Sequence, residues 1–406
     1  MNTFKLAWRN VWRNARRSIV TVIAMALALF AMVQYAGFMR GYQTDLANSA
    51  VNIEMGDLQI HGKGYLEKPT LYKNISNANA LVSQIERIAP GVYASARILG
   101  SGLIASDHNS APAMFKGVEA EKDKRVSDVC QHVSAGKWLS PKDSHGVVIG
   151  AQLARILNVR PGDELIFLSQ AADGSAANEL FHLRGTVTGA GSDVERAQVF
   201  MNKDTLARFL NIKNAHQILV RTSGAIDNAT LQTKIRTLAP TLDVKTWQEI
   251  SPELASMIAY MSTALVFMSL LVYIAIGIVV LNAMLMAVFE RIREFGIMKA
   301  IGVSPLGVFR IIVAETAVLL MCSIVVGMII SLPVGYSLAT HGIDLSSQMS
   351  SVSVSGVGVS PVMKAVFDIK TILTPVALLA AVVFISILYP ALKASLLQPI
   401  SAIHHQ

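Results

Sequence analysis

Four runs without a charged residue constrain this chain more than any other feature. Each is longer than 20 residues, and a helix needs about 20 apolar residues to cross the hydrocarbon core of a bilayer. The runs are Ser18 to Met39, Leu254 to Phe289, Thr316 to Thr340 and Thr371 to Leu392. We therefore expect four transmembrane helices, one near the N-terminus and three in the C-terminal part of the chain.

The composition agrees with a membrane protein. Hydrophobic residues make up 52% of the 406 residues and charged residues only 15%, which is too apolar for an ordinary soluble domain. The net charge of +8 could indicate nucleic acid. However, basic residues gather beside the apolar runs, as they do on the cytoplasmic side of membrane proteins, so we expect no nucleic-acid partner. These residues are Lys5, Arg9, Arg13, Arg16, Arg17, Arg291, Arg293, Lys299 and Arg310.

A long segment of mixed polarity separates the first two apolar runs. Strand-like and helix-like stretches alternate in it, which predicts an α+β domain with a core of its own. The expected strands lie near 57–60, 146–150, 164–168, 183–188, 198–201 and 218–221, and the expected helices near 152–157, 203–210 and 229–238. The basic flanks predict that this domain lies outside the cell membrane and that both termini lie in the cytoplasm.

The expected order of segments follows from the runs. The second run has 36 residues and would form a helix of about 54 Å, so we expect stalks that project beyond the bilayer. We expect a cytoplasmic amphipathic helix (1–17), the first span and stalk (18–44), the outer domain (45–253), a stalk and second span (254–289), a cytoplasmic coupling segment (290–307), the third span (308–340), an outer loop (341–370), the fourth span (371–397) and a cytoplasmic tail (398–406).

Residues 290–305, ERIREFGIMKAIGVSP, form a charged segment between two apolar runs. Glu290 and Glu294 are one helical turn apart, and a short helix from Gly296 to Ile301 should end at Gly302. Such a segment can be a plain connector, but the regular helix bounded by glycines favours a docking site for a soluble protein.

Motifs for catalysis are missing from the sequence. It has no P-loop and no H-E-x-x-H, C-x-x-C or G-x-S-x-G pattern, so we expect no catalytic residue, no metal site and no cofactor bound by this chain. Glu315 stands five residues past Arg310 at the start of the third apolar run. We expect it to reach the membrane interface or to pair with Arg310.

The charged segment resembles the signature of the FtsX-like permeases, E-R-x-R-E-[IF]-G-[IL]-x-[KR]-A-[IL]-G. Further stretches agree with this family: Leu6 to Asn10, Val148 to Ala154, Val159 to Asp163, Tyr389 to Ala394 and Gln398 to Ala402. The two stretches near residue 150 are similar to the MacB-type periplasmic core domain. In length and layout the chain most resembles the lipoprotein-releasing permeases LolC and LolE.

The resemblance implies a mechanotransmission (type VII) ABC transporter permease of the bacterial inner membrane. Two permease chains, identical or not, would sit on two copies of a separate ATPase that holds ATP and Mg, and a periplasmic carrier or adaptor can join them. The implied ATPase-coupling residues are Glu290, Arg291, Arg293, Glu294, Gly296, Lys299, Ala300 and Gly302. A hydrophobic or lipid-anchored substrate is expected near Met39, Met257, Tyr260 and Met261.

Three other functions stay open at this point. The chain could regulate a periplasmic cell-wall hydrolase, as FtsX-like regulators do, or serve as an efflux permease with a periplasmic adaptor. It could also be a membrane-anchored enzyme, although the outer domain shows no polar site that would support one.

Overall fold

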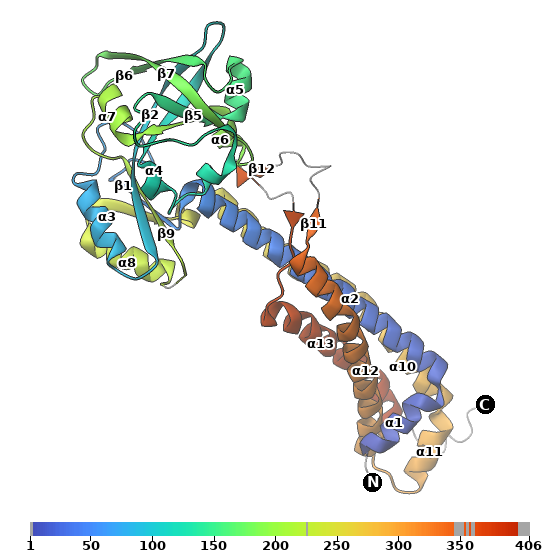
Figure 1. The fold of residues 1–406 in the computed structure, drawn as a ribbon. Coiled ribbons are helices and arrows are strands. Elements are labelled where there is room, and N and C mark those ends of the chain that lie inside the picture. Colours follow the sequence, from blue (N-terminus) through green and yellow to red (C-terminus); the bar gives the residue numbers. More distant parts are fainter. Residues whose placement is uncertain (1–2, 225, 345–352, 355–356, 359–361, 397–406) are drawn as a thin grey trace. The chain divides into compact units, whose positions relative to one another are not determined.

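The computed structural model describes residues 3–224, 226–344, 353–354, 357–358 and 362–396. The chain divides into two compact units. The helical unit comprises Met1–Gln43, Ile258–Asp344 and Val362–Gln406, and the β-domain comprises Thr44–Met257 and Leu345–Pro361. Figure 1 shows helices throughout the first unit and a sheet with short helices in the second. The expected tail (398–406) and parts of the 341–370 loop (345–352, 355–356 and 359–361) lie outside the described residues.

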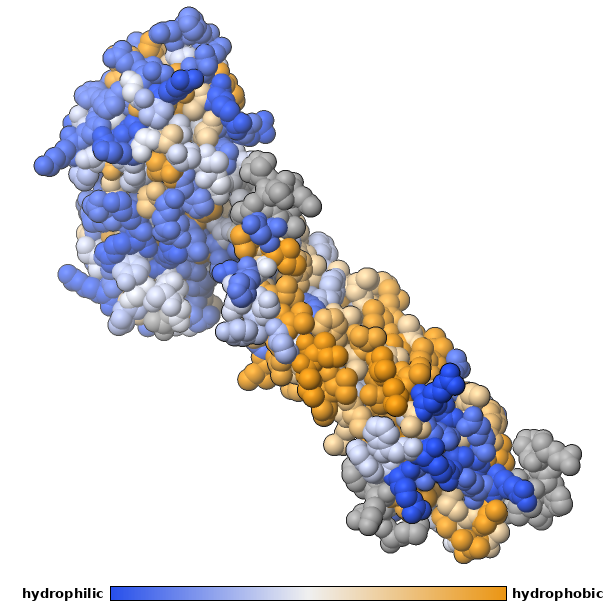
Figure 2. Space-filling view, turned by 45° about the vertical axis from the view of Figure 1, so that its right-hand side comes forward, coloured by the Kyte–Doolittle hydropathy of each residue, from blue (hydrophilic) through white to orange (hydrophobic). Residues whose placement is uncertain are grey.

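Helices account for nearly all of the described helical unit. They are α1 (Thr3–Arg13), α2 (Ala15–Ala50), α10 (Pro252–Glu290), α11 (Ile292–Ala300), α12 (Pro305–Thr340) and α13 (Ile369–Leu396). Four of these, α2, α10, α12 and α13, are long and apolar enough to cross a membrane, which confirms the four expected spans. Their surface is largely hydrophobic, as Figure 2 shows. In addition, α2 continues without interruption into a π-helical turn, η1 (Val51–Met55).

The N-terminal helix is shorter than expected. The expected helix over residues 1–17 is in fact α1, which ends at Arg13, while Arg16 and Arg17 belong to the first turn of α2. A turn at Asn14 separates the two helices. There the Ser18 hydroxyl donates a hydrogen bond to the Val11 carbonyl at 2.7 Å, so a side chain satisfies a backbone acceptor at the helix end.

The helices pack through rows of apolar residues and through small residues where the backbone comes close. In α13, Leu379, Val383 and Ile387 recur every four residues and are fully buried. On α2, a Cβ atom added to Gly41 would lie 1.9 Å from the Lys364 carbonyl oxygen. This glycine therefore allows the extended segment before α13 to pass directly against α2.

The β-domain is an α+β structure, as expected. Each of the nine stretches expected from the sequence overlaps an element of the expected type. The elements are β1 (Leu58–Gly62), α3 (Ala78–Glu86), β2 (Val92–Ala105), β3 (Ser110–Val118), α4 (Ala120–Asp123), η2 (Val129–His132), β4 (Val133–Gly136), β5 (Gly146–Gly150), α5 (Ala151–Leu157), β6 (Glu164–Gln170), β7 (Ala176–Val187), α6 (Ser192–Ala197), β8 (Gln198–Asn202), α7 (Lys203–Phe209), β9 (Gln217–Thr222), α8 (Asn228–Leu238), β10 (Leu242–Thr246), α9 (Trp247–Ile250), β12 (Ser353–Val354) and β13 (Val357–Gly358).

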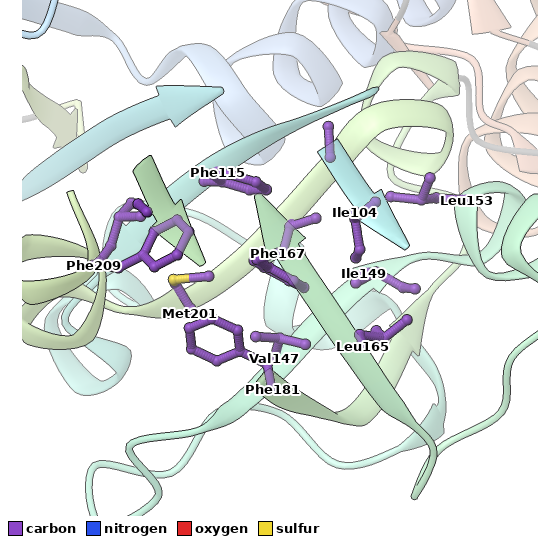
Figure 3. Packing of buried hydrophobic residues seen from close by; sticks show 14 of the residues in the cluster. Ile104, Phe115, Val147, Ile149, Leu153, Leu165, Phe167, Phe181, Met201 and Phe209 are labelled. Atoms are coloured by element: carbon purple, nitrogen blue, oxygen red, sulfur yellow. The ribbon is translucent and has the colours of Figure 1, made fainter. Parts of the chain in front are cut away.

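Six strands of this domain close into a ring. Strand β2 pairs with β3, β3 with β8, β8 with β5, β5 with β7, β7 with β6, and β6 pairs back with β2. The inside of the ring is filled by aromatic and aliphatic side chains, as expected for a small barrel. Figure 3 shows Phe115, Phe167 and Phe181 in this core, with Phe115 and Phe167 stacked at 5.1 Å between ring centroids.

The first half of β2 belongs to a second layer. Strands β10, β1 and β9 continue the sheet from it, and helices α3 and α8 cover one face. Because β2 runs through both parts, the domain cannot be cut between them without breaking a strand. At the middle of β2, Arg97 forms a fully buried ion pair with Asp123 of α4, with Nε to Oδ1 at 2.7 Å.

Candidate functional site: the junction of α1, α11 and α12

Helix α11 connects α10 to α12, and hydrogen bonds at its C-terminus and at the start of α12 define where it ends. At its C-terminus, Gly302 has φ +97° and its amide donates to the Lys299 carbonyl, while the Val303 amide donates to Met298. These two bonds form a Schellman motif, which ends a helix at glycine. The next helix starts two residues later, where the Ser304 hydroxyl accepts from the Gly307 amide. The helix begins at Ile292 rather than near Gly296, and Gly296 lies buried within it.

A buried ion pair anchors the start of α11. The Arg291 guanidinium lies 2.9 Å from Glu315 Oε1 on α12, and both side chains are at most 12% exposed. The Asn10 side chain of α1 donates to the same carboxylate oxygen at 2.6 Å. Glu315 therefore joins α1, α11 and α12 at one point. The expected pairing of Glu315 with Arg310 was wrong. Arg291, which lies between α10 and α11, binds Glu315 instead.

Two further ion pairs join the N-terminal helices to the same junction. Arg13 Nη2 lies 2.7 Å from Glu294 Oε1, and Arg17 Nη1 lies 2.6 Å from Glu290 Oε2. Arg291 also binds Glu294, with Nε to Oε2 at 2.8 Å. Although burial disfavours its charge, the hydrogen bonds from Arg13 and Arg291 hold the pKa of Glu294 below its usual value. Glu294 therefore stays ionised at neutral pH.

The structure separates the expected coupling residues into two groups. Five of them make contacts inside the helical unit or lie buried there: Glu290, Arg291, Glu294, Gly296 and Lys299, whose ammonium donates to the Ser395 carbonyl at 2.8 Å. The other three are exposed: Arg293, Ala300 and Gly302. The first group therefore positions α11, and the second is available to a partner.

Three exposed apolar residues on this side were missed in the sequence. Ile297 is 49% exposed, Ile301 77% and Leu306 56%. Ile297 and Ile301 stand one and two helical turns after Arg293, so the three residues share a face of α11. That four-residue spacing was readable in the sequence, but only the burial of Phe295 shows which face points outward. We call Ile297, Ile301 and Leu306 the apolar tip.

Replacing Gly302 by alanine should strain this junction. Nothing lies within 4 Å of a Cβ atom at this position, so the expected effect comes from the backbone alone. A non-glycine residue with positive φ costs about 1–2 kcal/mol, and asparagine tolerates it better than alanine. Thermal unfolding of the purified chain should show Gly302→Ala below wild type and Gly302→Asn between them. Equal unfolding temperatures for alanine and glycine would contradict this explanation.

At its far end, α2 is fixed into the β-domain through the π-helical turn. Ile53 of this turn is buried in the domain core. Its carbonyl accepts from the Ser127 hydroxyl at 2.7 Å, and the Asn52 carbonyl accepts from the Asp128 amide at 2.7 Å. Glu54 pairs with Lys116 of β3. The last turns of this helix are therefore part of the β-domain.

The expected substrate residues lie on the two stalk helices. Met39 is on α2, and Met257, Tyr260 and Met261 follow one another on α10. Tyr260 is 73% exposed, whereas the three methionines are partly buried. Close to them, the Gln43 amide donates to the Ser262 hydroxyl at 3.2 Å, which links α2 to α10. Among the described residues, no group of three His, Cys, Asp or Glu side chains could hold a metal ion.

Comparison with known proteins identifies the class. Residues 18–238 match the MacB-like periplasmic core domain, and residues 266–399 match the FtsX-like permease C-terminal domain. The chain is 20% identical to the lipoprotein-releasing system transmembrane protein LolC of Xylella fastidiosa over 96% of its own length and 94% of that protein. It is 23% identical to LolE of Haemophilus influenzae, covering 98% of each chain.

Solved structures give a weaker likeness. The periplasmic region of MacB from Actinobacillus actinomycetemcomitans has 13% identity and a TM-score of 0.36, covering 50% of this chain and 94% of that one.

The four membrane helices and the matched domains define an ABC transporter permease of the type VII architecture. The chain belongs to the FtsX-like permease family with a MacB-like periplasmic core domain.

Proposed function

We propose that this chain transmits ATP-driven motion from a separate cytoplasmic ATPase to its β-domain. The observation that carries the proposal is the apolar tip: Ile297 and Ile301 are exposed in the C-terminal part of α11, while ion pairs at its N-terminal end fasten it to α1 and α12. An exposed apolar face on a rigidly held helix suits docking to another protein. Two permease chains on two ATPase copies, which hold the ATP and Mg, complete this proposed complex.

The direction of the chain in the membrane supports this arrangement. Arg13, Arg17, Arg291 and Arg293 all lie at the α1 and α11 end of the helical unit. The positive-inside rule then puts that end and both termini in the cytoplasm, in a bacterial inner membrane, and the β-domain in the periplasm. The ATPase would push on α11, and the long helices α2 and α10 would carry the displacement outward as rigid rods.

We further propose that the cargo is a lipoprotein or another hydrophobic substrate of the inner membrane. The full-length similarity to LolC and LolE supports this choice. The alternatives are a regulator of cell-wall hydrolases and an efflux permease with a periplasmic adaptor. In each case the permease itself needs no catalytic residue.

Copurification tests the function directly. The chain is purified from its native membrane in mild detergent, and the bound proteins are identified by mass spectrometry. We expect an ABC ATPase together with lipoproteins or a lipoprotein carrier. An adaptor or outer-membrane duct would favour efflux, and a wall hydrolase would favour regulation. Recovery of an intact membrane complex without any ATPase would refute the proposal.

A photocrosslinker at Tyr260 tests the cargo. Tyr260 is exposed near the outer end of α10, so a benzophenone side chain there should capture acylated protein during ATP turnover. The matched control is Tyr389 on α13, which is 58% exposed and lies one helical turn from Lys393. We expect at least several-fold more acylated product at Tyr260. Equal capture at both positions would remove the stalk helices as the cargo site.

A further inference from the structure

An apolar groove lies between α1, α2 and α12, all within the helical unit. Its volume is about 520 Å³. Trp8 and Trp12 of α1 form one wall, Ile19 and Ile23 of α2 a second, and Val325 of α12 belongs to a third. Because α2 and α12 are membrane-spanning helices, this groove opens on a surface that faces lipid.

Unpaired positive charge stands beside the groove. The first 17 residues contain five basic residues and no acidic one. Arg13 and Arg17 are neutralised by Glu294 and Glu290. Arg9 and Arg16 are exposed, and neither forms an ion pair with any described residue. Figure 2 shows hydrophilic residues next to the hydrophobic surface at this end of the helical unit.

The two arginines stand within one helical turn of residues that line the groove. Arg9 is three residues before Trp12 on α1, and Arg16 is three residues before Ile19 on α2. Tryptophan prefers the level of the lipid headgroups, where its ring is half in the apolar region. The groove therefore presents an apolar slot whose headgroup end carries two uncompensated positive charges.

We propose that this groove binds one anionic phospholipid. An acyl chain would lie between Trp8 and Trp12 and the walls from α2 and α12, with the phosphate at Arg9 and Arg16. Charge complementarity favours this occupant, because a basic residue near the membrane attracts anionic lipid. A second copy of α1 would instead bring positive charge against positive charge, since the first acidic residue of the chain is Asp45.

The proposed lipid site is connected to the junction described above. The same short helix α1 that forms the groove wall also holds Glu315 through Asn10 and Glu294 through Arg13. A lipid that seats α1 against α2 and α12 therefore stabilises the contacts that fix α11. Lipid composition would in this way set how firmly α11 is held.

Tryptophan fluorescence can report on this site in the full chain. Trp8 and Trp12 line the groove, whereas Trp138 and Trp247 lie in the β-domain. The chain is reconstituted in phosphatidylcholine vesicles that contain an increasing fraction of a lipid brominated on its acyl chain. The brominated lipid is phosphatidylglycerol in one series and phosphatidylcholine in the other. Bromine quenches only nearby tryptophan. Half-maximal quenching should need a lower fraction of brominated phosphatidylglycerol than of brominated phosphatidylcholine. Each arginine should lower this fraction by roughly fivefold.

Charge-matched variants separate the site from general membrane attraction. The double variant Arg9→Gln and Arg16→Gln should lose the preference for phosphatidylglycerol. The control is Arg155→Gln and Arg160→Gln, two exposed arginines of the β-domain, which should keep it. Equal quenching by the two lipids in wild type, or an unchanged preference in the first variant, would overturn the proposal. Absence of quenching by either lipid would show that protein fills the groove, and would overturn it too.

Discussion

Arg291→Met is expected to lower the thermal stability of the helical unit strongly. The variant leaves the Glu315 carboxylate buried without its ionic partner, and breaking a buried pair in this way costs about 3–5 kcal/mol. For a unit of this size the loss corresponds to a fall of about 10 °C in unfolding temperature. The measurement is thermal unfolding of the purified chain in detergent.

Two variants make this result specific. Arg291→Met combined with Glu315→Leu removes both charges, so most of the lost stability should return. Arg310→Met removes an exposed arginine near the start of α12 that forms no ion pair with the described residues, and it should change the free energy of unfolding by about 0.5 kcal/mol or less. If Arg310→Met destabilises the chain as much as Arg291→Met, the buried pair is not the cause.

Ile301→Asp should weaken binding of the ATPase by about 30-fold or more. Ile301 is 77% exposed, so the change hardly affects folding, but a charge would be buried at the centre of the proposed contact. Loss of one interface anchor costs about 2 kcal/mol or more, which corresponds to this factor. The measurement is the affinity of the copurifying ATPase for the permease in nanodiscs, together with its stimulated ATP turnover.

The matched control is Ile369→Asp. Ile369 is 82% exposed in the same helical unit, but it lies at the start of α13, whose other end contacts α11 through Ser395 and Lys299. Affinity and turnover should stay at the wild-type level in this variant. Unchanged affinity in Ile301→Asp would show that the apolar tip is not where the ATPase binds, whatever other function the chain has.

Some parts of this structure could be predicted because they depend on local properties of the sequence. A membrane span needs only a sufficient length of apolar residues, so all four were evident. The end of α11 at Gly302 followed from the preference of glycine for positive φ. The strands near 146–150 and 198–201 have continuous apolar runs, and both are found as expected.

Other parts depend on contacts between distant residues. Glu315 was expected to use Arg310, five residues before it on the same helix, but Arg291 reaches it across 24 residues because α11 folds back. Strand β2 was missed because its sequence, VYASARILGSGLIA, is rich in small residues and shows no clear alternation. Its glycines lie against Leu210 and Phe115, a close approach that exists only after folding.

Because the six strands close into a ring, few of their backbone N–H and C=O groups are free to bind another protein. In the described part of the β-domain the sheet ends at β10 and β4, which have five and four residues, and each pairs on one side only. A partner that binds by adding its own strand needs a free edge, and short edges offer few hydrogen bonds. We therefore expect a protein that binds this domain to contact mainly its loops and side chains.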